Sequence, residues 1–248
     1  MRLVCSAKAL LHPSTVWEDG VGLLSRFWRG GAICFIVSPE DRSLPTNANL
    51  NGFTALELRS LRRLKTPAGI QAFIDSLPYH LADTAWSPRH ALRERTAHCL
   101  EGALLAAAAL RVNGYPPLVM DLEAVRDVDH VIAVFRERGL WGAVAKSNFA
   151  GLRFRAPIYR SLRELALSYF ESYYNLRGER TLRGYSRPVD LSRFDHLDWM
   201  TSEKSVWAIA EHLVTVSHFP LFPARLAKNL PRLDRRSFDA GLTGYVKH

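Results

Sequence analysis

Residues 99–112 read Cys-Leu-Glu-Gly-Ala-Leu-Leu-Ala-Ala-Ala-Ala-Leu-Arg-Val, and this stretch decides the fold. Alanine and leucine are strong helix formers, and the run has almost no polar face, so it predicts a helix that is buried on most sides. Asn113-Gly114 follows, and both residues tolerate the left-handed conformation in which many helices end. We therefore expect the elements on either side to pack around this helix.

Upstream of the buried helix, three segments are predicted to be helical. Residues 54–64 carry leucines at helical spacing beside arginines, which is typical of an amphipathic helix with one solvated face. Thr66-Pro67 supplies an N-cap and a first-turn proline for a helix to about Leu77. Ser87-Pro88 repeats this device for a short helix toward Arg95.

Downstream of the buried helix, the spacing of apolar residues changes to two, which predicts strands over residues 118–122, 130–136 and 140–146. Glu137-Arg138-Gly139 predicts the hairpin turn between the last two. Further expected elements are an edge strand at 152–155, a helix opened by a capping box at Ser161–Glu164, and helices near 203–216 and 223–230. Helices followed by hairpins predict an α+β fold, with helices packed on a small antiparallel sheet.

The domain organisation follows from these patterns. Residues 1–52 are weakly patterned, and we expect this segment to be poorly ordered or to lie upstream of the domain. Residues 53–195 are expected to form the core, and residues 196–248 a helical extension packed on it.

The composition is that of an ordinary globular chain, with 248 residues, 48% hydrophobic and 23% charged. No run approaches about 18 consecutive apolar residues, so no membrane partner is expected. The first residues lack a signal-like apolar run with a cleavage site, which favours a cytoplasmic location. The three cysteines (Cys5, Cys34 and Cys99) are too few for a disulfide framework and lack structural-zinc spacing.

The formal net charge of +9 would suit an acidic partner. No RNA-binding signature or zinc finger accompanies it, so nucleic-acid binding is not expected. We expect a peptide or protein substrate, acidic if the basic surface contributes to binding. The sequence gives no indication of a cofactor or of the oligomeric state.

Cys99, at the expected start of the buried helix, is the candidate nucleophile. Exposed N–H groups and the partial positive charge of a helix N-terminus lower the pKa of a thiol and can stabilise an oxyanion. His130, at the start of the first hairpin strand, is the candidate base, and we expect its imidazole to face the cysteine helix.

The third member of such a site is less well defined. A turn at Arg138-Gly139 places Ser147 across from His130, with Asn148 adjacent. Asn148 could accept the imidazole N–H and fix the tautomer if a bulge turned it inward. Ser147 could do so only feebly, and a site without a third residue stays open.

Each candidate also has a purely structural interpretation. A cysteine at the start of an alanine-rich helix is more often a small buried hydrophobe, a lone histidine at a strand end is usually structural, and an asparagine after a strand is usually a turn residue. The combination of a helix cysteine with a hairpin histidine makes the catalytic interpretation stronger than either residue alone.

Several motifs carry a family resemblance: Cys99-Leu100-Glu101-Gly102, Asp129-His130-Val131-Ile132-Ala133-Val134-Phe135, Gly139-Leu140-Trp141, Ser161–Leu165 and Leu182–Ser186. Together they resemble the transglutaminase-like superfamily of papain-like cysteine enzymes, and most closely an uncharacterised bacterial branch. The resemblance runs from about Leu64 to Asp195, rather more than half of the chain. It implies that Cys99 is the nucleophile and His130 its base. The family's third residue, an Asp or Asn, is not matched, because the usual position of the Asp holds Ala145.

Three hypotheses about function follow. The first is acyl transfer through a Cys99 thioester, with water as acceptor in a peptidase or amidase, or an amine in a transglutaminase. The second is a transglutaminase-like fold that binds peptides or proteins without catalysis, which the missing Asp favours. The third is a metal site formed by His98, Cys99 and His130, which lacks the tight pair of ligands typical of such sites.

Overall fold

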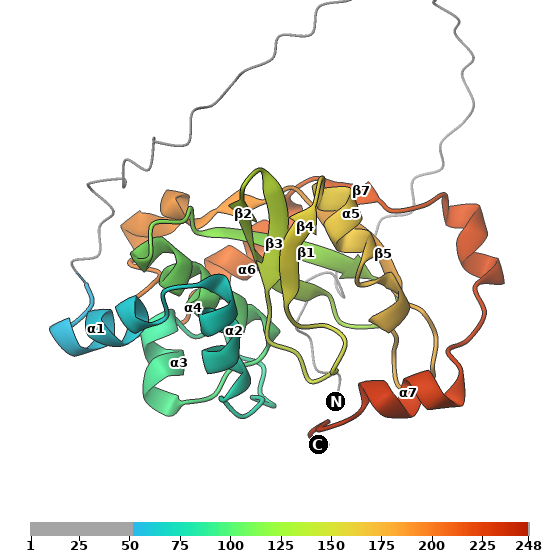
Figure 1. Cartoon of the computed structure of the whole chain (residues 1–248), viewed down its shortest axis with the longest axis horizontal. Helices are drawn as coiled ribbons and strands as arrows, with labels where there is room; N and C mark the ends of the chain where they lie inside the picture. Colours follow the sequence, from blue (N-terminus) through green and yellow to red (C-terminus); the bar gives the residue numbers. More distant parts are fainter. Residues whose placement is uncertain (1–51, 248) are drawn as a thin grey trace, which may run out of the picture.

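The computed structural model describes residues 52–247, so the predictions for residues 1–52 fall, except for Gly52, outside the described part of the chain. Within it, a sheet of seven strands is paired antiparallel throughout in the order β4-β3-β2-β1-β5-β7, and β6 also pairs with β1. Helices lie on both faces of this sheet (Figure 1). The predicted α+β class is therefore confirmed.

The helices have the following bounds: α1 (Ala55–Arg63), α2 (Pro67–Asp75), α3 (Pro88–Glu94), α4 (Cys99–Val112), α5 (Leu162–Leu167), α6 (Trp207–Thr215) and α7 (Arg235–Gly241). Short 3₁₀ helices are η2 (Phe170–Ser172), η3 (Leu191–Leu197) and η4 (Ala224–Asn229). The strands are β1 (Leu118–Ala124), β2 (His130–Glu137), β3 (Leu140–Val144), β4 (Arg155–Tyr159), β5 (Leu182–Ser186), β6 (Val189–Asp190) and β7 (His218–Pro220).

The second and third helices begin where their capping residues predict, and the first, predicted from periodicity, begins one residue after Thr54. Thr54 and Glu57 form a reciprocal capping box at the start of α1. The side chains of Thr66 and Ser87 accept backbone N–H groups of the first turns of α2 and α3, each of which begins with a proline. Local sequence therefore fixes these helix starts.

The hairpin of β2 and β3 has the predicted register. Glu137 pairs with Leu140 and Ala133 with Val144, so the turn lies at Arg138-Gly139. Both turn residues have positive φ (49° and 81°), as a two-residue hairpin turn requires.

The core has two layers, one on each face of the sheet. α4 lies on the face to which Val131, Ala133 and Phe135 of β2 belong, in a cluster that includes residues of α1, α2, α3 and α6. The opposite face, with Ile132 and Val134 of β2, packs against α5 and the residues that follow it. In Figure 1, α1 to α4 gather on one side of the sheet and α5 on the other.

The sheet departs from the sequence-based prediction in its outer strands. The strand expected at residues 152–155 is β4, three residues further along, and it forms one edge of the sheet. The apolar pattern does not predict β5, because Arg183 and Gly184 interrupt it. β7, beyond residue 195, pairs with β5 and forms the other edge. None of the helices in the described residues is long and apolar enough to cross a membrane.

Candidate functional site

Cys99 is the first residue of α4, and His98 is the N-cap. The His98 Nδ1 accepts the N–H of Leu100 at 3.3 Å, and Glu101 accepts the N–H of His98 at 3.2 Å, so side chains cap this helix end in both directions. The cysteine is only 5% exposed. It nevertheless borders a cavity of about 280 Å³, which gives a small reactant a place beside it.

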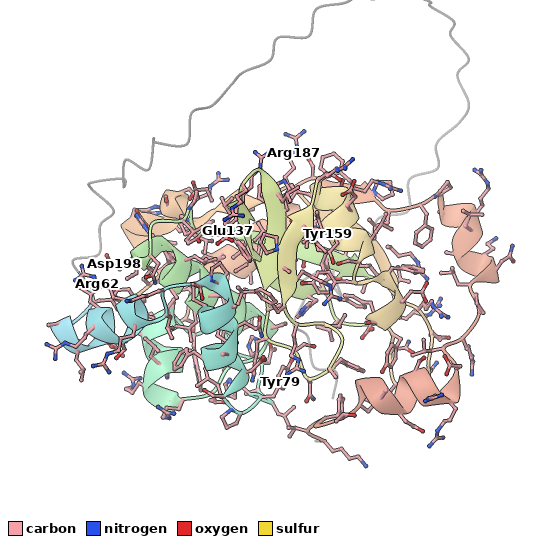
Figure 2. All side chains as sticks on the ribbon, viewed as in Figure 1. Arg62, Tyr79, Glu137, Tyr159, Arg187 and Asp198 are labelled. Atoms are coloured by element: carbon pink, nitrogen blue, oxygen red, sulfur yellow. The ribbon has the colours of Figure 1, made fainter. Side chains whose placement is uncertain are left out.

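The wall of this cavity comes from six parts of the chain. They are the loop before α3, the start of α4, the β1–β2 connection with His130, the segment after β3, the residues after α5, and Tyr245 after α7. Figure 2 labels Tyr79, from the first of these parts, at the lower side of the molecule, where the chain that follows α7 ends in Figure 1. The cavity therefore collects the predicted site residues Cys99, His130 and Asn148, together with Ser147.

His130 reaches the cavity from a different direction than expected. Strand alternation places it with Ile132 and Val134, on the face of the sheet opposite α4. Its ring makes edge contacts with Tyr169 and Tyr173, at centroid distances of 6.5 and 6.4 Å. His130 and Cys99 thus reach the cavity from the two layers of the molecule, at the end of the sheet where β2 begins.

A main-chain group accepts a hydrogen bond from the His130 imidazole and helps to orient it. Its Nε2 lies 2.9 Å from the carbonyl oxygen of Leu152. A carbonyl oxygen only accepts hydrogen bonds, so Nε2 carries the proton and the neutral ring keeps its lone pair on Nδ1. The Leu152 carbonyl therefore occupies the position that we expected Asn148 to take.

Asn148 lines the cavity, but its side chain is engaged elsewhere. The Asn148 amide donates to the carbonyl of Val246 at 2.9 Å and accepts the N–H of Val246 at 2.8 Å. The hydroxyl of Ser147, the other residue considered, accepts the N–H of Phe149 at 3.0 Å. The structure thus places both residues beside the cavity and gives each a partner other than His130.

Behind Cys99, the fully buried carboxylate of Glu101 joins the helix start to the cavity wall. It accepts from the hydroxyl of Thr84 at 2.5 Å, from the N–H of Trp86 at 3.2 Å and from the N–H of His98, and it lies 3.0 Å from Nδ1 of His80. These partners include residues from 80 to 86, so a single carboxylate fixes this loop over the start of α4.

His98, which sequence reasoning did not assign to the nucleophile, adjoins it. Its Nε2 donates to the carbonyl of Thr84 at 2.8 Å. Burial lowers the pKa of His98, but the hydrogen bond and charge interaction with Cys99, the charge of Glu101 and the Thr84 carbonyl outweigh it and raise the pKa to about 9. An imidazolium beside the sulfur would favour the thiolate form of Cys99, but it could no longer accept the N–H of Leu100, so the charged ring and this helix cap are alternatives.

Two carboxylates complete the cavity, and both lie just before His130 in the sequence. Asp129 accepts the N–H of Ala124 at 2.7 Å and so holds the β1–β2 connection. Burial raises the pKa of Asp127, against the hydrogen bonds from Thr181 and Val128 and the charge of His130. The sequence Asp-Val-Asp-His at 127–130 could have indicated these two carboxylates, because residues that immediately precede a strand lie close to its first residue, here His130.

A metal site is the other chemistry that these residues allow. Within the described residues, the ligand atoms of His80, His98 and Glu101 lie within 4.8 Å of one another. Both oxygens of Glu101 already accept protein hydrogen bonds, and Nε2 of His98 donates to Thr84. This hydrogen-bond network accounts for the cluster, and it differs from the His98, Cys99 and His130 set considered from the sequence.

Comparisons with known proteins add nothing to this geometry, because no protein-family model and no curated protein matches the chain.

Proposed function

We propose that the protein is a cysteine-dependent acyl-transfer enzyme with a transglutaminase-like core, in which Cys99 is the nucleophile and His130 its base. The observation that carries the proposal is the shared cavity: the thiol at the start of α4 and the imidazole at the start of β2 border the same space. Acyl transfer needs a nucleophile and a base around one reacting carbonyl.

The tautomer of His130 suits this role. With Nε2 bound to the Leu152 carbonyl, Nδ1 is the nitrogen that can take the proton of the thiol. The sulfur then adds to a substrate carbonyl, and the oxyanion forms beside the N-terminus of α4, whose partial positive charge stabilises it. His130 returns the proton to the leaving amine, and a thioester with Cys99 remains.

The acceptor decides the overall reaction. Water attacking the thioester releases a carboxylic acid and regenerates the thiol, as in a peptidase or amidase, whereas an amine gives a new amide, as in a transglutaminase. The cavity is bordered mainly by aromatic and aliphatic side chains, with Asp127 and Asp129 as its carboxylates. These side chains favour an apolar, neutral or basic substrate group beside Cys99. Acidic residues of a substrate would therefore bind outside the cavity.

The test is selective alkylation of Cys99. In a Cys5→Ser/Cys34→Ser background, Cys99 is the remaining cysteine, because the chain has three. We expect iodoacetamide to label it near pH 6 well above the rate of a small free thiol such as N-acetylcysteine. A 4-nitrophenyl ester should also give a burst of one nitrophenol per chain, which Cys99→Ala abolishes. Labelling no faster than the free thiol, or a burst that survives Cys99→Ala, would refute the proposal.

The alternative is a binding module with the same fold and no catalysis. The low exposure of Cys99 and the peptide-like contact at Asn148 favour it. In that case an extended peptide would bind at the cavity, while the ester would give no burst.

A further inference from the structure

The residues after α7 lie at the cavity that holds Cys99. Tyr245 borders this cavity, and its ring packs on that of Phe149 at a centroid distance of 5.3 Å. Val246 follows and is held by Asn148. In Figure 1 the chain runs from α7 to its C-terminal end at the lower side of the molecule, where Tyr79 of the cavity wall is labelled in Figure 2.

The contact between Asn148 and Val246 recognises a main chain, and not a particular side chain. The carboxamide oxygen accepts the N–H of Val246, and the carboxamide nitrogen donates to the C=O of the same residue. A neighbouring β-strand offers the same pair of donor and acceptor. Meanwhile Val246 is 41% exposed, so the identity of its side chain contributes little to this contact.

The segment that carries these residues is held loosely. None of the residues of α7 is buried. Its attachments include the ring of Phe238 against Tyr174, the Tyr174 hydroxyl donating to the Phe238 carbonyl at 3.0 Å, and the Ala150 N–H donating to the Gly241 carbonyl at 2.9 Å. Segments with little buried apolar surface open at low cost in free energy.

From this we infer that Asn148 and Phe149 form a subsite for the main chain of an extended peptide substrate, and that Tyr245 and Val246 occupy it in the resting protein. The inference rests on the function proposed for Cys99 and adds a substrate class and a means of regulation. A substrate peptide must displace Tyr245 and Val246, which we call the tail. It then pairs with Asn148 through its own backbone and presents a carbonyl at Cys99. Asn148 is a positioning residue in this scheme.

Opening the tail tests the first half of the inference. Val246→Pro removes the N–H that Asn148 accepts, and Asn148→Ala removes both hydrogen bonds without a proline. In the Cys5→Ser/Cys34→Ser background we expect each variant to speed alkylation of Cys99 about tenfold, the effect of losing one or two modest hydrogen bonds that hold a closed state. Lys247→Ala is the matched control, because it changes an exposed neighbour and leaves both backbone groups of Val246 in place.

Supplying the tail as a separate peptide tests the second half. A fluorescein-labelled peptide with the sequence of residues 244–247, Gly-Tyr-Val-Lys, should bind the full-length Val246→Pro variant in fluorescence anisotropy and slow the alkylation of Cys99. Adding Asn148→Ala to that variant should weaken binding about tenfold. Equal binding with and without Asn148, or no binding, overturns the inference, as does an unchanged alkylation rate in both tail variants.

These outcomes separate the inference from the proposed function. Failure of the function appears as a Cys99 that gives no burst with the ester, whatever the anisotropy shows. If the inference fails, Cys99 still gives the burst with the ester, but neither opening the tail nor adding the peptide changes its rate of alkylation.

Discussion

The imidazole of His130 and the main-chain carbonyl of Leu152 are joined by a hydrogen bond of 2.9 Å. Orientation of a histidine by a main-chain group makes the arrangement independent of the side chain at position 152. The path of the chain between β3 and β4 sets it, through the turn in which the Leu152 N–H donates to the Phe149 carbonyl at 3.2 Å. Nε2 therefore has a hydrogen-bond acceptor that does not depend on any side chain.

Replacing His130 should remove the proposed base and leave the proposed nucleophile, Cys99, in place. We expect His130→Ala to lower the rate of the nitrophenyl-ester burst by a factor of about 100 or more, the usual contribution of a positioned general base. The exposed His196, whose Nδ1 lies 3.0 Å from the Arg193 carbonyl, provides the control. His196→Ala should leave the burst rate unchanged, and a His130→Ala protein with the parent burst rate would exclude His130 as the base.

Glu101→Gln should destabilise the fold around the cysteine. The amide would present an N–H₂ group to donors that now face a carboxylate, so at least one buried donor would lose its partner. We expect the free energy of unfolding in urea to fall by about 3 kcal/mol. Glu94→Gln, on the surface of α3, should change it by less than about 0.5 kcal/mol. A Glu101→Gln variant as stable as the parent would contradict the role assigned to this carboxylate.

Gly102→Ala should be destabilising, although alanine is the better helix former. A Cβ at Gly102 would overlap the Cβ of Lys146, whose ammonium is fixed by the carbonyls of Ile74 and Leu77 at the end of α2. We expect a loss of about 1–3 kcal/mol in urea unfolding, as for other overpacked cores.

Gly69→Ala is the matched comparison, since Gly69 also lies in the first turn of a helix. A Cβ there would meet Thr66 Oγ1 at 3.3 Å, and we expect a change of less than about 1 kcal/mol. Similar effects at the two glycines would show that α4 does not approach Lys146 as closely as described.

The Arg111–Asp195 pair should make stability depend on acid pH. Two hydrogen bonds of 2.5 and 2.6 Å from Arg111 hold the pKa of Asp195 below its ordinary value, against the opposing effect of burial. A carboxyl whose pKa is lowered on folding contributes stability above its unfolded pKa of about 3.9, and this is lost as the pH falls through the folded pKa.

We therefore expect Asp195→Asn to cost about 2 kcal/mol at pH 7 and to flatten the decline in stability below about pH 4. Thermal unfolding followed from about pH 7 to about pH 2.5 measures both effects. Asp239→Asn, which breaks an exposed pair with Arg235, should leave the acid limb of the profile as it is. An Asp195→Asn protein with the parent's acid profile would refute the linkage.

What the sequence predicted well is local. The capping residues Thr66 and Ser87 fix helix starts through contacts three residues away, and the turn at Arg138-Gly139 fixes the register of the whole hairpin. The buried α4 follows from composition alone, and its predicted bounds agree with the structure.

What escaped prediction depends on distant parts of the chain or on the main chain. The partner of Asn148 is 98 positions away, and β7 reaches β5 only because the chain returns after α6. The acceptor for His130 is a carbonyl, which every residue possesses, so no side-chain pattern could reveal it. We expected the His130 imidazole to face α4, but α4 covers the other face of β2. Periodicity predicts that side chains alternate between the two faces of a strand, and it does not indicate which face packs against which helix.

The four-partner carboxylate of Glu101 has a mechanical consequence for the cavity. Residues 80–86 and the start of α4 share one buried acceptor, so moving this wall would break several hydrogen bonds at once. Tyr245, which also borders the cavity, follows α7, and none of the residues of that helix is buried to resist displacement. The cavity thus combines a side next to Cys99 that buried hydrogen bonds hold in place with a side at Tyr245 that can be displaced at low cost in free energy.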